Sequence, residues 1–244
     1  HVDPLNPLLS CRLLKAIYGT PQASRLFYLT IKAALTKLGF HPSVADECLF
    51  IKRNGTSFMK LLVHVDDFAI TYNDRKLYDE VFAAMQLQFK MTDFGGGELE
   101  RFLGIEIERA ADSAVRLHQG PYLDELFSRL QVQGTARSPE AAGSKRRLRP
   151  APLPLSEADA RLMADFDYKG AVAALFYVAR ATRPDIAHAV SQVARFMDRP
   201  GPCHREAVLR IYLYLCRTRN VALRMHASDM ALGVHDCEAF SDAD

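Results

Sequence analysis

Apolar and polar positions along the first part of the chain predict a helix followed by strands. Leucines recur at near-helical spacing over residues 24–38 and stop at Gly39, a residue that often ends helices. Two runs rich in apolar and β-branched residues follow at 49–52 and 58–65, with the turn signal Asn54-Gly55 between them. This pattern predicts one amphipathic helix and a β-hairpin.

Strand character then resumes at residues 68–72 after a break of two residues. The break consists of Asp66 and Asp67, so the pattern places two adjacent carboxylates at a tight connection between two strands. Asn73 or Asp74 can then cap a helix that ends before the three glycines at 95–97.

The rest of the chain is predicted to be mostly helical. A strand at 101–109 and a short helix ending near residue 130 precede a stretch, 131–157, that loses periodicity and collects Pro, Ala, Ser and basic residues. Further predicted elements are helices at 168–181, 184–197 and 205–217 and a strand at 237–241. The order of elements shows no sustained alternation of strand and helix, so the predicted fold class is α+β.

Composition excludes few functions. With 31 Lys and Arg against 29 Asp and Glu, the formal net charge of +2 is compatible with a nucleic-acid partner without requiring one. The five cysteines are scattered with no C-x-x-C pair, so reduced thiols in an intracellular protein are expected. No stretch approaches the roughly 20 apolar residues of a membrane span, so no membrane partner is expected.

Two carboxylates at the rim of a sheet suit Mg²⁺, because this ion prefers hard oxygen ligands and takes one or two protein carboxylates beside substrate phosphates. Taken alone, an Asp-Asp dipeptide is more often a hydrophilic turn between strands. The residues around Asp66 and Asp67 favour the metal site. The segment Leu61 to Ile70, Leu-Leu-Val-His-Val-Asp-Asp-Phe-Ala-Ile, resembles the catalytic hairpin of reverse transcriptases, which usually reads Tyr-Val-Asp-Asp.

Other segments resemble those of copia-type retrotransposon reverse transcriptases, in the same order along nearly the whole chain. They are Leu14 to Gly19, Gln22-Ala23 with Arg25, Ala45-Asp46, Leu49 to Ile51, Phe102 to Ile107, Gln119 with Tyr122, Thr182 to Ala187, and Phe240 to Asp244.

The resemblance implies roles for single residues. Asp66 and Asp67 match the family's second and third metal-binding aspartates, for Mg²⁺ or for Mn²⁺ in its place. Gln22 and Arg25 lie in the loop and helix start that position template and incoming nucleotide, and His64 stands at the usual Tyr that contacts the primer end. Asp242 matches the first carboxylate of a ribonuclease H site.

Two further segments match regions with other duties in the family. Phe102 to Ile107 resembles the strand region that supports the primer grip. Thr182 to Ala187 resembles a connection helix without an assigned chemical role.

The chain also departs from the family pattern. The family's first metal-binding aspartate lies in a strand before the Tyr-Gly loop. Asp3, the only Asp before that loop, sits beside Pro4 without an apolar strand and is not assigned. His64 replaces Tyr, Thr20-Pro21 replace Leu-Lys, and the sequence contains no Trp.

The resemblance implies a partial right-hand polymerase palm at 1–130, an antiparallel sheet with helices. A linker at 131–157, a helical connection at 158–228 and the first strand of ribonuclease H at 229–244 would follow. The expected activity is two-metal, RNA-directed DNA synthesis within a longer Pol polyprotein. Its partners would be RNA template, DNA primer, deoxynucleoside triphosphates and the rest of that polyprotein, in a cytoplasmic particle or the nucleus. Two alternatives stay open: a catalytically dead relic that binds nucleic acid, and a metal-dependent nuclease that uses the same hairpin.

Overall fold

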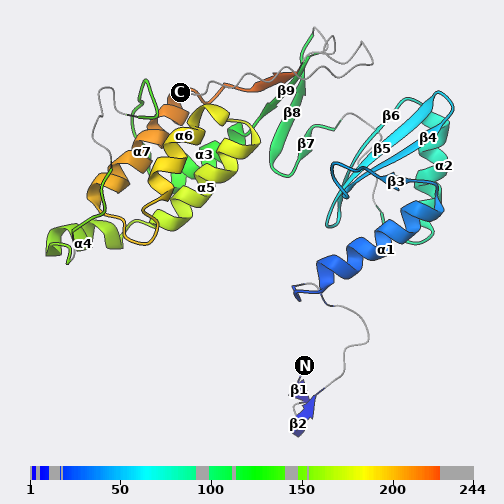
Figure 1. The fold of residues 1–244 in the computed structure, drawn as a ribbon, viewed down its shortest axis with the longest axis horizontal. Coiled ribbons are helices and arrows are strands. Elements are labelled where there is room, and N and C mark those ends of the chain that lie inside the picture. The colour runs from blue at the N-terminus through cyan, green and yellow to red at the C-terminus, as the bar shows by residue number, and fades with distance from the viewer. Residues whose placement is uncertain are drawn as a thin grey trace. The chain divides into compact units, whose positions relative to one another are not determined.

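The structure is a computed structural model that describes residues 2–3, 6–10, 17, 19–91, 99–111, 114–140, 148–152 and 154–225, with only the backbone of residues 2–10. The chain forms two compact units, His1–Glu98 and Leu99–Asp244 (Figure 1). Each unit is an α+β arrangement with an antiparallel sheet, which confirms the predicted fold class.

The first unit contains a four-stranded antiparallel sheet in the order β3-β4-β5-β6. The predicted first helix, the hairpin around Asn54-Gly55 and the strand after Asp66 are all confirmed. The elements of this unit are β1 (Val2–Asp3), β2 (Asn6–Ser10), α1 (Ala23–Lys37), β3 (His41–Pro42), β4 (Leu49–Asn54), β5 (Ser57–His64), β6 (Asp67–Tyr72) and α2 (Arg75–Gln86).

Both helices of this unit cover the same face of the sheet. Every second residue of β5 is buried (Met59, Leu61 and Val63), as expected for a strand with one face against a core. These side chains join one core with the apolar residues of α1 and α2, while the alternate positions of β5 lie on the other face. Asp74 accepts the Lys76 N–H at 2.9 Å and so caps α2, as predicted.

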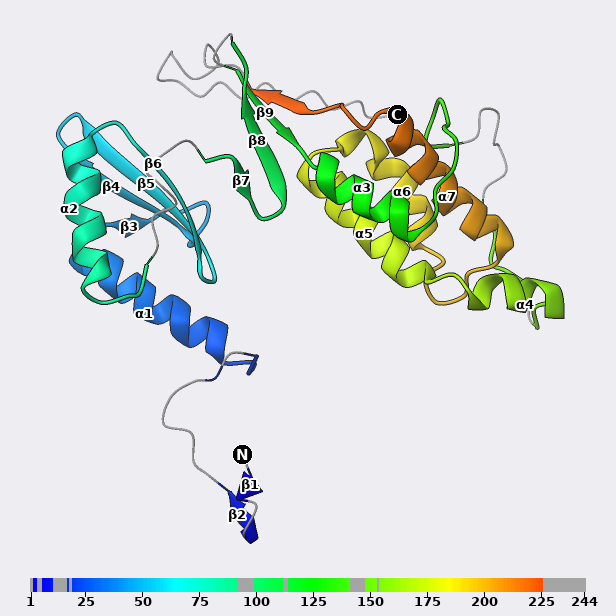
Figure 2. The ribbon, with the colours of Figure 1, turned by 180° about the vertical axis from the view of Figure 1, so that it is seen from behind.

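The second unit combines a four-stranded antiparallel sheet, in the order β10-β9-β8-β7, with a bundle of helices (Figure 2). Its elements are β7 (Arg101–Phe102), β8 (Ile105–Arg109), β9 (Val115–His118), α3 (Gly120–Arg129), α4 (Glu157–Ala164), α5 (Tyr168–Ala181), η1 (Pro184–Ile186), α6 (Ala187–Ala194), α7 (Pro202–Arg217) and β10 (Leu223–Met225). The core lies among α3, α5, η1, α6 and α7.

The predicted single strand at 101–109 is wrong. The chain reverses at Leu103 and Gly104, and β7 pairs with β8 antiparallel, Phe102 opposite Ile105. Both turn residues have a positive φ, 51° for Leu103 and 74° for Gly104. Leu is not a turn-forming residue, so its apolar side chain hides this reversal from a pattern of strand propensities.

A helix begins at the last residue of the predicted linker. Helix α4 begins at Glu157, at the end of the stretch expected to lack structure, and Ser156 caps it by accepting the Asp159 N–H at 3.1 Å. The compact units also divide near residue 98 and not at 130, because α3 packs into the helical core. The predicted functional boundaries at 130, 157 and 228 stay predictions.

Some predicted features lie outside the described residues. They are the glycines at 95–97, the strand at 237–241 and the whole predicted start of ribonuclease H, 229–244. Among the helices that the structure describes, none has the length and apolar character needed to cross a membrane.

Candidate functional site

The two adjacent aspartates lie where β5 turns into β6. His64, the last residue of β5, pairs with Asp67, the first of β6, and Val65 and Asp66 form the turn between them. Val65 has a φ of 53°. A β-branched residue rarely adopts a positive φ, and such strain costs about 1–3 kcal/mol and clusters at functional sites.

The carboxylate of Asp67 and the imidazole of His64 lie on the sheet face opposite to α1 and α2. This follows from the alternation along β5 and β6, because Val63 and its partner Phe68 point into the core. His64, Val65, Asp66 and Asp67 are all exposed. The turn therefore presents its polar groups at an open edge of the unit.

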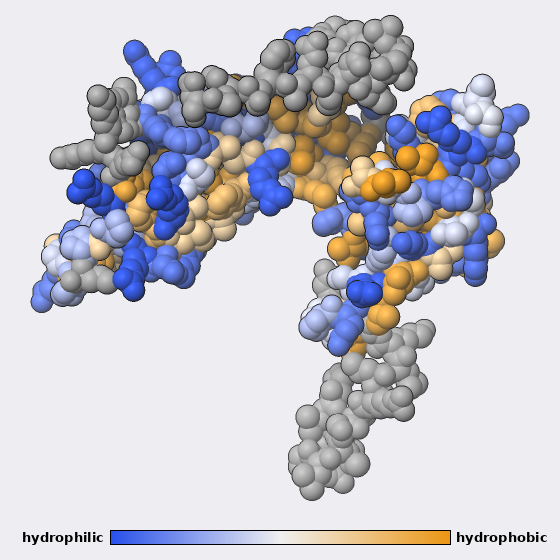
Figure 3. Space-filling model, viewed as in Figure 1, coloured by the Kyte–Doolittle hydropathy of each residue, from blue (hydrophilic) through white to orange (hydrophobic). Residues whose placement is uncertain are grey.

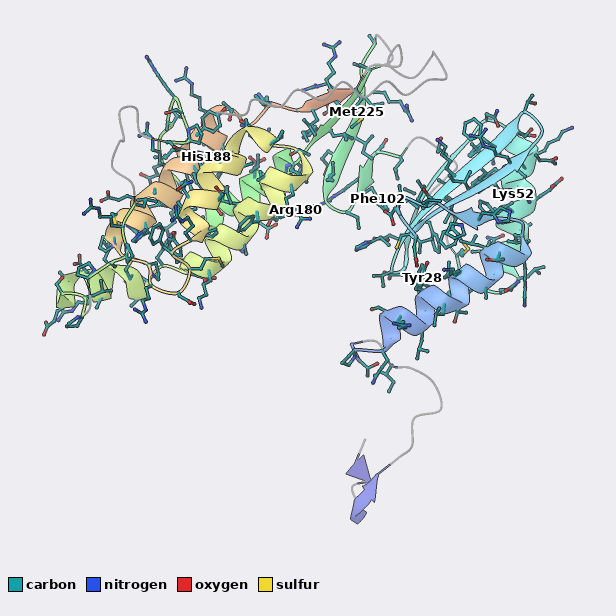
Figure 4. The ribbon with its side chains drawn as sticks, in the orientation of Figure 1. Tyr28, Lys52, Phe102, Arg180, His188 and Met225 are labelled. Atoms are coloured by element: carbon teal, nitrogen blue, oxygen red, sulfur yellow. The ribbon has the colours of Figure 1, made fainter. Side chains whose placement is uncertain are left out.

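A pocket of about 280 Å³ adjoins this turn. It lies between the start of α1, the start of β4 and the end of β5, and Figure 4 labels Tyr28 on the side of α1 that faces the sheet. The residues that line it are Ser24, Arg25, Phe27, Tyr28, Cys48, Val63, His64 and Val65.

Tyr28 connects α1 to the segment that leads into β4. Its hydroxyl lies within hydrogen-bond distance of the Glu47 carbonyl, 3.2 Å, and of the Glu47 carboxylate, 3.3 Å. Burial is the main cause that raises the pKa of the Tyr28 phenol above its usual value. Burial, helped by Asp46 and Glu47, also raises the pKa of the Cys48 thiol, so this cysteine stays protonated and is a poor nucleophile.

The carboxylate oxygens of Asp66 and Asp67 suit a hard divalent cation, but the described residues supply no third ligand beside them. Among the described residues, neither the Asp66 nor the Asp67 carboxylate takes part in a hydrogen bond or ion pair, so their oxygens are available. Two carboxylates are the number of protein ligands that Mg²⁺ commonly takes. No group of three or more His, Cys, Asp or Glu side chains that could hold a metal ion occurs within the described part of the chain.

The structure brings together some of the sequence-predicted residues. Arg25 and His64 line the same pocket, next to the Asp66 turn. Gln22 does not line it: this residue is exposed and immediately precedes α1, and its side chain does not cap the helix.

Asp242 lies outside the described residues, and Asp3 falls in β1, where only the backbone is described.

Sequence reasoning missed Tyr28 and Cys48 as pocket residues and Val65 as a strained residue. The helical spacing of Ser24, Arg25 and Tyr28 is a signal that could have joined Tyr28 to the site, because residues four apart share a helix face. Nothing in the sequence marks Cys48, since its position depends on how β4 enters the sheet.

Comparison with known proteins adds independent findings. The family model described as "Reverse transcriptase (RNA-dependent DNA polymerase)" matches residues 6–139. The whole chain is 34% identical to the retrovirus-related Pol polyprotein from transposon RE1 of Arabidopsis thaliana, and 96% of it is 31% identical to the corresponding protein from transposon TNT 1-94 of Nicotiana tabacum. A putative transposon Ty5-1 protein of Saccharomyces cerevisiae is 28% identical over 98% of the chain and 75% of its own length.

The two plant relatives are much longer than this chain, which spans 16% of the RE1 protein and 18% of the TNT 1-94 protein. No solved structure matches the chain.

Proposed function

Because the chain belongs to the reverse transcriptase (RNA-dependent DNA polymerase) family, we propose that it is the part of a copia-type Pol polyprotein that supplies two metal-binding carboxylates for RNA-directed DNA synthesis. The observation that carries this proposal is the exposed turn at Val65 to Asp67. Its strained backbone and two available carboxylates stand at the open face of a sheet whose other face is covered by helices.

Asp66 and Asp67 are the residues that would hold Mg²⁺, or Mn²⁺ in its place. The chemistry supplied by the bound ions is activation of the primer 3′-hydroxyl and stabilisation of the leaving pyrophosphate.

Arg25, His64 and Gln22 would position the nucleic acid and the nucleotide. Arg25 lines the pocket beside the turn, and its guanidinium would suit a phosphate oxygen. His64 lies opposite Asp67 and would contact the primer end from the same sheet face, where an imidazole offers a ring and a hydrogen-bonding group. Gln22, exposed at the entry of α1, would contact the template at a point outside the pocket.

A third carboxylate would come from a strand that adds to β6. In the described sheet β6 is the end strand, and its first residue is Asp67. A strand that pairs with the free edge of β6 would place side chains next to Asp67, since directly paired residues lie about 5 Å apart. Such a strand would belong to another part of the Pol polyprotein.

The helical residues after the first sheet would serve as the connection between polymerase and ribonuclease H, with Asp242 as the first ribonuclease H carboxylate. We place the linker at 131–157, the connection at 158–228 and the start of ribonuclease H at 229–244, as the sequence resemblance implies.

The test is primer extension on an RNA template, with Mg²⁺ or Mn²⁺, by the purified chain and by a longer Pol segment that contains it. Each is compared with its Asp66→Asn, Asp67→Asn double variant and with Glu80→Gln, which removes an exposed carboxylate from α2. We expect extension by the longer segment, a loss of at least about 100-fold in the double variant and no change in Glu80→Gln.

Other outcomes would select other functions. Mg²⁺-dependent cleavage of the template without incorporation would show a nuclease. Salt-sensitive binding of an RNA–DNA hybrid without extension or cleavage by either protein would show a catalytically dead relic.

A further inference from the structure

An irregular segment, residues 134–140, lies beside α6 and α7 of the second unit (Figures 1 and 2). Near its start, the buried Ala136 donates its N–H to the Leu213 carbonyl of α7 at 3.1 Å. At its end, the Glu140 carboxylate lies 2.6 Å from Nδ1 of His188 on α6, which Figure 4 labels. Two contacts therefore anchor the segment to the helical bundle, one on either side of its middle.

The middle of the segment places a serine hydroxyl beside an arginine whose donors are not fully used. The Ser138 hydroxyl donates to the Glu140 carbonyl and accepts from Nη2 of Arg210, on α7, at 3.5 Å. That distance is long for a hydrogen bond from a guanidinium. Nε of Arg210 is buried and has no hydrogen-bond partner among the residues that the structure describes. Because a buried donor without an acceptor is unfavourable, this guanidinium is poised for a group that offers more than one acceptor oxygen.

The sequence at this point is typical of a protein kinase substrate. Ser138 is followed by Pro139, and the only other hydroxyl residue before a proline in the chain is Thr20. A proline disfavours helical backbone at the residue before it, so the serine stays in an irregular segment that can enter a kinase active site. The Thr20 hydroxyl donates to the Ile17 carbonyl at 2.9 Å, and no arginine within the described ranges hydrogen-bonds to it. Of the two hydroxyl residues, Ser138 is therefore the one with a guanidinium beside it.

We propose that Ser138 is a phosphorylation site and that Arg210 binds the resulting phosphate. The co-reactant is ATP, bound by a serine kinase that recognises a following proline. Ser138 Oγ forms a bond to the γ-phosphorus of ATP, the bond from that phosphorus to ADP breaks, and the hydroxyl proton passes to a base of the kinase. This inference does not depend on the proposed polymerase function.

The phosphate would supply the acceptors that the arginine lacks. A phosphoserine carries a charge of about −1.5 to −2 and three strong acceptor oxygens, which can take Nε–H and Nη2–H of Arg210 together. Glu140 is the acidic residue closest in sequence, and its carboxylate is directed to His188. Figure 3 shows hydrophilic side chains on the outer surface of α6 and α7, so the phosphate would keep its contact with water. Its bond to Arg210 would fix the segment, which is the start of the predicted linker, on the helical bundle.

The experiment treats the full chain with Mg²⁺, ATP and a purified proline-directed serine kinase, beside a peptide of residues 131–142. Mass spectrometry identifies the modified residue and separates Ser138 from Thr20. Phosphorus NMR then measures the second pKa of the phosphate in the phosphorylated wild type, in Arg210→Gln and in Arg217→Gln. The last variant is the matched control, because Arg217 is an exposed arginine of the same helix. Hydrogen exchange of the Ala136 N–H is measured before and after phosphorylation.

We expect the kinase to modify Ser138 in the folded chain. The second pKa of the phosphate should lie about 0.5 to 1 below its ordinary value of about 6, because the guanidinium stabilises the dianion. Arg210→Gln should return this pKa to the ordinary value, and Arg217→Gln should leave it as in the wild type. Exchange of the Ala136 N–H should slow by roughly 3- to 10-fold on phosphorylation, the effect of one added hydrogen bond to a charged group.

A folded chain that carries no phosphate on Ser138 would overturn the proposal, and the peptide would show whether the sequence or its place in the fold is the cause. Equal phosphate pKa values in the wild type and in Arg210→Gln would overturn the role of Arg210. If Arg210→Gln does not fold, the phosphorylated wild type in concentrated urea replaces it. The phosphate pKa should then rise on unfolding, and a phosphate pKa that stays the same would again count against Arg210.

Discussion

His204 is a buried titratable residue at the start of α7. It is fully buried, its ring lies 4.2 Å from the Phe196 ring, and its Nδ1 accepts the Gly201 N–H at 2.9 Å. A nitrogen that accepts a hydrogen bond carries no proton, so the folded chain holds this imidazole neutral. Burial is the main cause that lowers the pKa of His204 below its usual value.

Because of His204, the free energy of unfolding should therefore decrease as the solution is acidified. The unfolded chain binds the proton at the ordinary histidine pKa, about 6.5, and the folded chain binds it only at lower pH. The contribution of neutral His204 to the free energy of unfolding is complete above about pH 6.5 and is lost as the pH falls below that value. Urea unfolding followed by circular dichroism between pH 7.5 and 5.5 should show this loss in the wild type and a flatter dependence in His204→Gln.

The matched control is His41→Gln, because His41 is an exposed histidine on β3 whose side chain makes no hydrogen bond or ion pair with the described residues. Its stability should keep the pH dependence of the wild type. If the free energy of unfolding of His204→Gln depended on pH as steeply as that of the wild type, the assignment of this pH dependence to His204 would be wrong.

At the candidate site, the sequence predicted a turn between two strands but not the backbone conformation of that turn. The strand pattern on both sides of Asp66 and Asp67 places them at a turn, and the structure confirms that turn. The positive φ of Val65 could not be foreseen, because a β-branched residue favours the extended region and only the pairing of His64 with Asp67 imposes the exception. The roles of these residues in catalysis stay predictions.

At the scale of the secondary-structure elements, the segment Thr182 to Ala187 links the end of α5 to the end of α7. Arg183 is 1% exposed and donates to both carboxylate oxygens of Asp185, at 2.9 and 2.8 Å, and to the Thr218 carbonyl at the end of α7, at 2.9 Å. Tyr214 of α7 donates to Asp185 at 2.8 Å. Burial alone would raise the pKa of Asp185, but the hydrogen bonds from Arg183 and Tyr214 outweigh it and lower the pKa.

Replacing this arginine should destabilise the helical unit. Arg183→Gln removes the guanidinium from Asp185 and from the Thr218 carbonyl, while the Tyr214 hydroxyl and the Val221 N–H still donate to them. Because Asp185 is 36% exposed, we expect a cost of about 2 kcal/mol, below that of breaking a fully buried pair. Chemical denaturation should show that decrease in the free energy of unfolding. Arg180→Gln changes an exposed arginine of α5 and should stay within about 0.5 kcal/mol of the wild type. Equal effects of the two substitutions would refute the structural role.

Sequence patterns predicted the elements that carry a repeating apolar pattern of their own. They missed the elements that depend on pairing with distant residues or that have no buried face. Helix α5 runs from Tyr168 to Ala181, as its apolar spacing indicated. Strand β10 was missed because three residues carry too little pattern, and it exists through pairing with β9, more than a hundred residues earlier. Helix α4 was missed because it has no buried residue and so no apolar face to detect.

For the whole molecule, each compact unit has its own core. All core residues of one cluster lie between Ile31 and Met85, and all those of the other lie between Leu123 and Leu215. No residue belongs to both clusters, so the free energy that stabilises one unit comes mainly from contacts inside it.

A cavity in one core should therefore leave the other unit unaffected. Leu61→Ala should destabilise the first unit by about 2–5 kcal/mol and speed hydrogen exchange in β4, β5 and β6. Exchange in α5 and α7 should not change, and Leu175→Ala should give the reverse pattern. Faster exchange in both units after either substitution would show that they unfold together.

Among the described strands β6 is the end strand of its sheet, and this edge also affects how the protein can be handled. From Asp67 to Tyr72 this end strand contains neither Pro nor Lys, the residues that commonly prevent a sheet edge from pairing with another chain. A concentrated solution of the chain should therefore form intermolecular β-ribbons through β6. A lysine at the exposed Thr71 should keep the chain monomeric long enough for spectroscopy.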